Sequence, residues 1–251
     1  MDIEKQWIGD NMILIVDYSK WQSRVNPNKL MAFGVSAAIV KCGEVWINYT
    51  DKPATDDAQY DNNMVALRDA ELPHGSYYYY HPSAGNSKQL RHYQSLWERH
   101  EHDFPPVLDV EDTDGLNPYE VQRQVKVMLE GMEEISGRKP IIYTRNGFWV
   151  NQVGNPLWSD DYQFWLAQYP KLTNKSVKNI IMHQFTDKLA VPGCPAMDGN
   201  YWIGTDYDFY EMVRPHGGSM PSIEHIKNNR IKKRIFVLSR ANRMWLENQM
   251  R

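Results

Sequence analysis

Pro106-Val-Leu-Asp-Val110 is a short apolar run, and Pro140-Ile-Ile-Tyr-Thr144 is a second one. Between them, residues 118–135 carry apolar side chains at helical spacing behind Asn117-Pro118, a favourable cap and first-turn pair, and Ser136-Gly137 ends the helix. Both runs are continuous rather than alternating, which is typical of strands buried on both faces of a parallel sheet. This segment therefore predicts a strand, a helix and a second, parallel strand.

The same pattern continues along the chain in both directions. Further strands are predicted at 12–16, 37–41, 76–80, 163–167, 179–183 and 205–209, and further helices at 56–70 and 87–102. Eight strands with helices between the early ones favour the α/β class and an irregular (β/α)8-like barrel. About 215 residues is short for that architecture, so some crossovers must be short or lack a helix.

Composition excludes several classes of protein. The chain has 251 residues, of which 42% are hydrophobic, and this excludes a disordered chain. No run approaches the ~18 apolar residues of a membrane-spanning helix. Two cysteines exclude a disulfide framework and a cysteine-rich zinc site, and no His/Cys spacing suggests a metal, so no metal and no cofactor is expected.

The net charge of −3 averages two unlike parts. Residues 216–251 hold eight Lys/Arg against two Glu, which is +6, and the preceding part is −9. We therefore expect a domain over 1–214, a Pro/Gly-rich linker over 215–221 and a basic, helical tail over 222–251. The tail could bind an anionic cell wall or membrane surface, or pack against the domain. No signal peptide is visible at the N-terminus, which predicts synthesis in the cytoplasm.

Acidic residues recur where the predicted strands end. They are Asp17, Asp109, Glu111, Asp206 and Asp208. A single acid is more often a solvated surface residue, but surface placement explains this recurrence poorly. Asp109 and Glu111 lie two apart and point to one side of a strand, so the more desolvated carboxyl should stay protonated towards neutral pH. A raised-pKa acid beside an ionised partner is the arrangement that glycoside hydrolysis requires.

Aromatic residues with polar edges are in surplus. The chain has 9 Trp and 15 Tyr against 7 Phe. Tyr77 and Tyr79 share one face of a predicted strand, and Tyr143, Trp165 and Tyr169 lie in or at the ends of others. They either fill the core or line a groove in which rings stack on sugars and phenols bond polar substituents.

At this point the sequence resembles the glycoside hydrolase family 25 lysozymes, the Chalaropsis-type N-acetylmuramidases of fungi, bacteria and phage endolysins. The resemblance runs from about Ile13 to Tyr210 and follows the family's order. Its anchors are Ile15-Val-Asp-Tyr-Ser19 with Trp21-Gln22, Ile39-Val-Lys41 with Gly43-Glu44, Gly75-Ser-Tyr-Tyr-Tyr79, Pro106-Val-Leu-Asp-Val-Glu111, Lys139-Pro-Ile-Ile-Tyr-Thr144, Phe164-Trp-Leu-Ala-Gln-Tyr169 and Asp206-Tyr-Asp-Phe-Tyr210. The resemblance implies a modified (β/α) barrel and cleavage of the β-1,4 bond between N-acetylmuramic acid and N-acetylglucosamine in peptidoglycan.

The resemblance also implies roles for individual residues. Glu111 matches the family's general acid and Asp109 its partner carboxylate. Asp17 and Asp206 match two further acids of the groove, and Tyr77 matches a ring at its floor. The remaining substrate-binding candidates are Tyr79, Tyr143, Trp165, Tyr169, Asp208 and Lys41.

Two positions depart from the family pattern. The family usually has Trp-Gln on the seventh strand, where this chain reads His183-Gln184, and His183 is expected to be a substituted groove or packing residue. It usually has Asp-x-Asn on the eighth, where this chain reads Asp206-Tyr-Asp208. The extra acid makes the fourth carboxylate ambiguous, and register favours Asp206. Lys41 could pair with Glu44 near the groove or form an ordinary surface ion pair.

The mechanism stays open between two retaining routes. Asp109 could attack the anomeric carbon, or it could orient the substrate's 2-acetamido group to do so.

We expect a monomer that acts on peptidoglycan glycan strands after release, like a phage endolysin, and no nucleic-acid partner. The alternatives are a non-catalytic wall-binding or structural domain of a phage particle, and a hydrolase of another amino-sugar polymer such as chitin, although the family 18 chitinase signature is missing.

Overall fold

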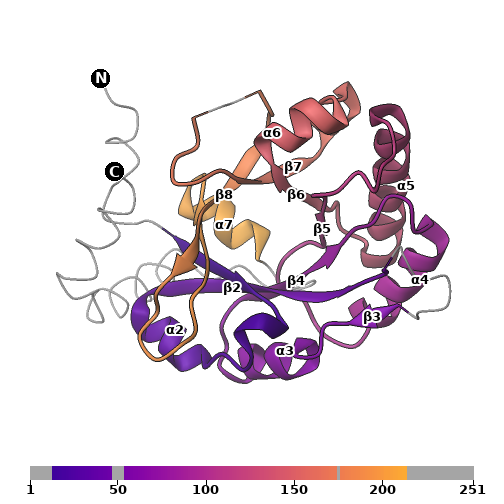
Figure 1. Ribbon diagram of the computed structural model, residues 1–251. Helices are drawn as coiled ribbons and strands as arrows, with labels where there is room; N and C mark the ends of the chain where they lie inside the picture. Colours follow the sequence, from indigo (N-terminus) through magenta and orange to yellow (C-terminus); the bar gives the residue numbers. More distant parts are fainter. Residues whose placement is uncertain (1–12, 47–53, 174–175, 214–251) are drawn as a thin grey trace.

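The computed structural model describes residues 13–46, 54–173 and 176–213 and forms a closed barrel of eight strands (Figure 1). The strand order is β1-β9-β8-β7-β6-β5-β4-β2, β1 pairs with β2 to close the ring, and β3 adds to the edge of β2. The strands are β1 (Leu14–Tyr18), β2 (Val35–Glu44), β3 (Thr55–Asp56), β4 (His74–Tyr79), β5 (Val107–Asp109), β6 (Ile141–Arg145), β7 (Gln163–Ala167), β8 (Ile180–Leu189) and β9 (Met197–Trp202). The predicted irregular barrel is confirmed.

Helices cover mainly the first half of the barrel. They are α2 (Pro27–Phe33), α3 (Tyr60–Asp69), α4 (Asn86–Trp97), α5 (Pro118–Ser136), α6 (Asn146–Phe148) and α7 (Asp206–Met212), with 3-10 turns at Lys20–Gln22 and Leu157–Asp161 and a π-helical turn at Trp149–Val153. Within the described part of 168–196, the crossovers from β7 to β8 and from β8 to β9 contain no helix. The short crossovers expected from the chain length lie there.

The ends of α5 show why the sequence forms this helix where it does. Asn117 accepts a hydrogen bond from the Glu120 amide at 3.0 Å, and Glu120 accepts one from the Asn117 amide at 3.3 Å, so the first turn is capped on both sides. Pro118 occupies the first turn, where its missing amide hydrogen costs nothing. Gly137 ends the helix with a left-handed φ of 66°, a conformation that glycine adopts without strain.

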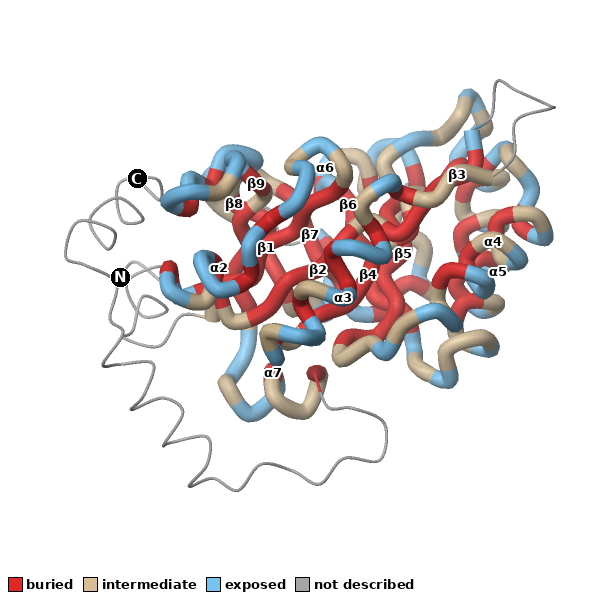
Figure 2. The backbone as a smooth tube through the Cα atoms, turned by 90° about the horizontal axis from the view of Figure 1, so that it is seen from below, coloured by how far each residue is buried: buried red, intermediate tan, exposed pale blue. Residues whose placement is uncertain are grey.

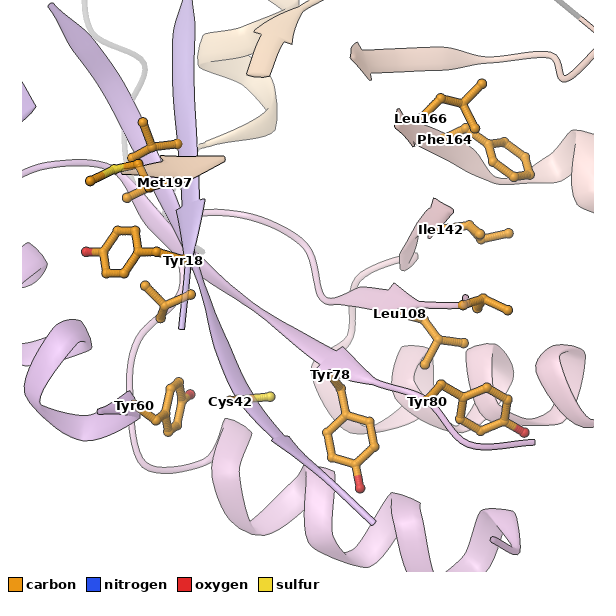
Figure 3. Packing of buried hydrophobic residues seen from close by; sticks show 14 of the residues in the cluster. Tyr18, Cys42, Tyr60, Tyr78, Tyr80, Leu108, Ile142, Phe164, Leu166 and Met197 are labelled. Atoms are coloured by element: carbon orange, nitrogen blue, oxygen red, sulfur yellow. The ribbon is translucent and has the colours of Figure 1, made fainter. Parts of the chain in front are cut away.

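Side chains alternate between two hydrophobic clusters because successive residues of a strand face opposite sides. The first cluster lies outside the barrel under the helices and includes Tyr18, Tyr78, Leu108 and Phe164 (Figure 3). The second cluster fills the barrel interior and includes Ile15, Ala37, Ile39, Val107, Ile141, Trp165 and Met182. Figure 2 shows the resulting buried ring of strands beneath a more exposed layer of helices and loops. The interior is therefore a packed core, and polar groups collect only at its end.

One predicted strand is wrong. Residues 205–209 begin helix α7, whose Thr205 cap accepts from the Asp208 amide at 3.2 Å, while the Thr205 amide donates to Asp208 Oδ2 at 2.9 Å. The eighth strand is β9 instead, and it runs antiparallel to both β1 and β8. The period-2 pattern of Asp206-Tyr-Asp208 resembles a strand, but this capping box at its start favours a helix.

The predicted linker over 215–221 and the predicted basic tail over 222–251 lie outside the described residues. Across 13–46, 54–173 and 176–213, none of the helices combines the length and the apolar composition that crossing a bilayer would demand.

Candidate active site

Four carboxylates meet at one end of the barrel. The seven strands that run parallel to one another place their carboxyl ends there, and antiparallel β9 starts there. Asp17 on β1 is the direct register partner of Asp198 on β9. Asp109 ends β5, and Glu111 follows two residues later. In a barrel of this type, side chains at this end are the ones free to act on a ligand.

Asp109 and Glu111 form the first acidic pair. The Asp109 side chain is buried, and burial followed by the charge of Glu111 raises the pKa of Asp109 well above its ordinary value. Burial also raises the pKa of Glu111, although Arg145, whose Nε lies 3.1 Å from Glu111 Oε2, lowers it. Because both pKa values are raised, the pair keeps a proton to a higher pH than isolated acids would.

The backbone between these two acids is held against the neighbouring strand. The Val110 amide donates to the Tyr143 carbonyl at 2.9 Å, and Thr144 Oγ1 donates to the Val110 carbonyl at 2.7 Å. Glu111 lies beyond the end of β5, but its position is fixed because the preceding residue, Val110, is hydrogen-bonded to β6. Its side chain is 26% exposed, which places it at the mouth of the barrel, whereas Asp109 lies deeper.

Asp17 and Asp198 form the second acidic pair. Asp17 Oδ2 accepts hydrogen bonds from Asn200 Nδ2 at 2.8 Å and Gln184 Nε2 at 3.0 Å. Burial raises the pKa of Asp17 to about 6, although these hydrogen bonds lower it. Burial, the charge of Asp17 and a hydrogen bond to Asp17 raise the pKa of Asp198 to about 9. Asp198 is therefore protonated at neutral pH and donates to Asp17.

Gln184 connects this pair to the aromatic residues. Its Oε1 accepts from the Tyr143 hydroxyl at 2.9 Å and from the hydroxyl of Tyr169 as well. With the amide oxygen occupied by two phenols, the amide nitrogen must face Asp17. On the other side, Trp165 Nε1 donates to Asn200 Oδ1 at 2.7 Å, so the amide nitrogen of Asn200 also faces Asp17.

Tyr77 lies between the two acidic pairs. Burial raises its pKa far above the ordinary value, and the charges of Asp17, Asp109 and Asp198 add to this effect in that order. Its phenol therefore keeps its proton and can donate it to a carboxylate or to a ligand.

Lys41, whose ammonium lies over the ring of Tyr79, brings a positive charge to the site. The Lys41 ammonium lies 4.7 Å from the centroid of the Tyr79 ring and 3.0 Å from Glu44 Oε1. The Lys41 charge lowers the pKa of both Asp109 and Glu111. The ion pair with Glu44 is not a surface pair, because both side chains are about nine-tenths buried, with exposed fractions of 12% and 9%.

Most of the site residues expected from the sequence come together, but two do not. Asp206 and Asp208 lie on α7 at the opposite end of the barrel, because antiparallel β9 carries the chain away from the carboxylate end. Phe209 of α7 contacts Trp202 and Phe104 there, with ring centroids 5.6 and 6.1 Å apart. Asp208 is fully exposed and caps its own helix.

The acid that sequence reasoning missed is Asp198, and the signal was present. Met197-Asp-Gly-Asn200 contains the Asp-x-Asn pattern expected on the eighth strand, eight residues before Asp206. The chain therefore keeps this pattern, and the prediction placed the eighth strand at the wrong residues. His183 lies on the outer face of β8, where its Nε2 donates to the Gln168 carbonyl at 2.7 Å, so it is a packing residue, while Gln184 is the member of the dipeptide that faces the site.

Residues 16–194 match the family described as Glycosyl hydrolases family 25. The uncharacterized protein YegX of Escherichia coli K12 is 28% identical over 154 residues, which cover 61% of this chain and 55% of YegX. The match thus spans about half the length of that relative.

Solved structures share the fold. The bacterial lysozyme from Streptomyces coelicolor superposes with a TM-score of 0.71 at 19% identity, covering 82% of this chain and 98% of the other. The catalytic domain of endolysin ply40 from the Listeria monocytogenes bacteriophage P40 superposes with a TM-score of 0.63 at 20% identity, covering 79% and 96%. The family match covers most of the described barrel and includes three of the four clustered acids, so the chain belongs to family 25 of the glycosyl hydrolases.

Proposed function

We propose that the protein is a peptidoglycan hydrolase that cleaves the β-1,4 bond between N-acetylmuramic acid and N-acetylglucosamine. The observation that carries this proposal is the pair of Asp109 and Glu111 at the open end of the barrel, whose pKa values are both raised by burial. Membership of family 25 supports it, as does the likeness to a bacterial lysozyme and to a phage endolysin domain.

Glu111 is the general acid in this mechanism. It lies at the mouth of the barrel, where a glycosidic oxygen can approach it, and its raised pKa keeps a proton for the leaving group. Asp109 lies deeper and becomes the ionised partner once Glu111 holds the proton. It then stabilises the positive charge that develops on the sugar ring. Two carboxyls two residues apart give a short separation, which favours retention of the anomeric configuration.

The second pair positions the substrate rather than transferring the proton. Asp17 is held by two amides and by protonated Asp198, so its remaining acceptor capacity is oriented before any ligand binds. A carboxylate of this kind accepts a hydrogen bond from an acetamido N–H group. Tyr77, which lies between the pairs, can donate to the same substituent or to Asp109. The ring of Tyr169, which is 48% exposed beside Gln184, provides a face for a sugar ring.

The setting that fits this activity is a bacterial cell wall reached from inside the producing cell. The partner is the glycan strand itself, and release in the manner of a phage endolysin would bring the enzyme to it.

The test is digestion of purified peptidoglycan followed by borohydride reduction and mass spectrometry. Wild-type protein should give reduced muramic acid ends, and Glu111→Gln and Asp109→Asn should lose at least about 100-fold in rate, as expected for loss of general acid catalysis. Asp208→Asn is the matched control, because it removes an acid from the opposite end of the barrel and should keep wild-type activity.

Two results would contradict the proposal. Glucosaminitol ends would show a different bond specificity. Wall binding without any released fragments would indicate a non-catalytic wall-binding or structural domain on the same fold.

A further inference from the structure

A row of four charged side chains leads away from the acidic pair of Asp109 and Glu111. Lys41 Nζ lies 3.0 Å from Glu44 Oε1, and Glu44 Oε2 lies 3.8 Å from His81 Nε2. His81 Nδ1 lies 3.0 Å from Asp114 Oδ1. The charges alternate in sign along the row when His81 is protonated.

Asp114 belongs to the loop that carries Glu111. The loop follows β5, and Asp114 has a left-handed φ of 50° that few non-glycine residues adopt. The Asp114 side chain is fully buried and accepts from the amide and the hydroxyl of Ser83 at 3.0 and 3.2 Å. Its own amide donates to Asp112 Oδ1 at 2.8 Å. The strained turn is therefore held in place by contacts to the loop after β4.

His81 connects the Lys41–Glu44 ion pair to Asp114. Its side chain is 8% exposed and lies between one carboxylate from β2 and one from the loop after β5. Its ring also contacts the Tyr79 ring with centroids 5.1 Å apart. Glu44, Asp114 and Tyr79 are thus ionisable groups that contact it in the described part of the chain.

We propose that His81, as an imidazolium between Asp114 and Glu44, is a positioning residue that fixes both the loop of Glu111 and the ammonium of Lys41. This inference rests on the proposed hydrolase function, which requires Glu111 to meet a glycosidic oxygen. A displacement of about 1 Å in a catalytic group is enough to cost a large part of the rate.

The charge of the row supports this role. Burial works against the charge of His81, but its hydrogen bond to Asp114 and the negative charges of Asp114 and Glu44 raise its pKa to about 9, so it is protonated at neutral pH. The pKa of Glu44 is lowered in return, because His81 and Lys41 outweigh its burial. Without the imidazolium, two buried carboxylates would lose their common partner, and Lys41 alone would neutralise Glu44.

The test compares His81→Gln with His92→Gln. His92 is a matched control because its side chain is 7% exposed and its Nε2 lies 2.9 Å from Asp56 Oδ1, yet it packs outside the barrel against Tyr78. His81→Gln should lower kcat about tenfold or more with little change in KM. It should also move the alkaline limb of the pH–rate profile up by about half a pH unit, because Lys41 is no longer held in place and lowers the pKa of Asp109 and Glu111 less.

His92→Gln should lower the melting temperature and leave kcat and the pH profile unchanged. His81→Arg should restore the pH limb and part of kcat, because guanidinium keeps the charge and can bond two carboxylates. In a double-mutant cycle, His81→Gln with Asp114→Asn should lose no more than the worse single variant. Wild-type kcat and an unshifted alkaline limb in folded His81→Gln would overturn the proposal, as would a loss that His81→Arg leaves unchanged in both measures.

A measurement without substrate separates this proposal from the hydrolase function. Amide hydrogen exchange over residues 111–117 should be faster in His81→Gln than in wild type or His92→Gln. If wild-type protein fails to cut peptidoglycan, the proposed function falls, and the exchange rates still decide whether His81 holds the loop. Unchanged exchange over 111–117 in His81→Gln overturns the positioning role in either case.

Discussion

Asp198→Asn should make the protein more stable at neutral pH while lowering its activity. Burial and Asp17 raise the pKa of Asp198 from 3.8 to about 9, so the folded chain holds a proton that the unfolded chain releases at neutral pH. The contribution of Asp198 to stability is therefore fully present below its unfolded pKa and is lost as the pH rises towards its folded pKa. Asparagine cannot ionise in either state and still has an N–H group to donate to Asp17, so the variant avoids this loss.

The size of the gain follows from linkage. The interval between the unfolded pKa of 3.8 and neutral pH corresponds to an upper bound of about 4 kcal/mol. Asp198 is partly solvated and its titration is divided with Asp17, so we expect about 1–2 kcal/mol. In a chain of this size that is a rise in melting temperature of about 2–8 °C.

Thermal unfolding at several pH values is the assay. Wild-type protein should lose stability between about pH 4 and about pH 9, and Asp198→Asn should lose less over the same range. Asp208→Asn provides a control of opposite sign, because hydrogen bonds from Thr205 lower the pKa of Asp208 and the variant should be less stable above the unfolded pKa. An Asp198→Asn variant that melts below wild type at neutral pH would refute the idea that this acid is held protonated at a cost.

Three further outcomes are expected. Gln184→Leu should destabilise the fold by about 1–3 kcal/mol in denaturant unfolding, because Asp17 loses one of its two amide donors in a buried site; a neutral result would contradict this account. Trp21→Ala should raise KM on polymeric glycan about three- to tenfold without changing the melting temperature, since its 80% exposed ring follows β1 at the open end of the barrel and can stack on a sugar. Gly75→Ala should cost about 1–3 kcal/mol, because a Cβ there would lie 2.7 Å from Phe104 Cβ inside the barrel, and unfolding at the wild-type midpoint would contradict it.

The parallel part of the barrel could be predicted from the sequence because its signals are local. A strand buried on both faces is a continuous apolar run, and seven such runs correspond to β1, β2, β4, β5, β6, β7 and β8. Asp109 and Glu111 could be placed for the same reason: they end a recognisable run, and in a parallel strand that end is the open end of the barrel.

The direction of the last strand could not be predicted in this way. Met197–Trp202 contains Asp198, Gly199 and Asn200, which all have low strand propensity, so the run is hard to recognise. It is a strand because tertiary contacts on both sides make it one: β1 and β8 leave open ladders that it pairs with. Once β9 is antiparallel, its acid Asp198 lies near its beginning, and the segment 205–209 that is predicted as the eighth strand belongs to the helix that follows β9.

The interactions around Gln184 were equally out of reach of the sequence. Its partners Asp17 and Tyr143 are far away along the chain and meet only when the barrel closes. The alternation of side chains predicts which residues face inward, but it does not predict which inward amide meets which acid.

Because the closing strand is antiparallel, the connection that precedes it can change in length without disturbing the packing of the outer layer. A parallel crossover must carry the chain back along the whole barrel, so a change in its length disturbs the packing of the outer layer. Residues 190–196 instead form a hairpin connection at the open end, and its two ends are anchored by neighbouring ladders. The contact of Lys29 Nζ with the Gly193 carbonyl at 2.8 Å is a tie at its tip. Insertions at this hairpin can reshape the rim around the acids while the strands that carry them stay where they are, which makes it the natural place to engineer the rim.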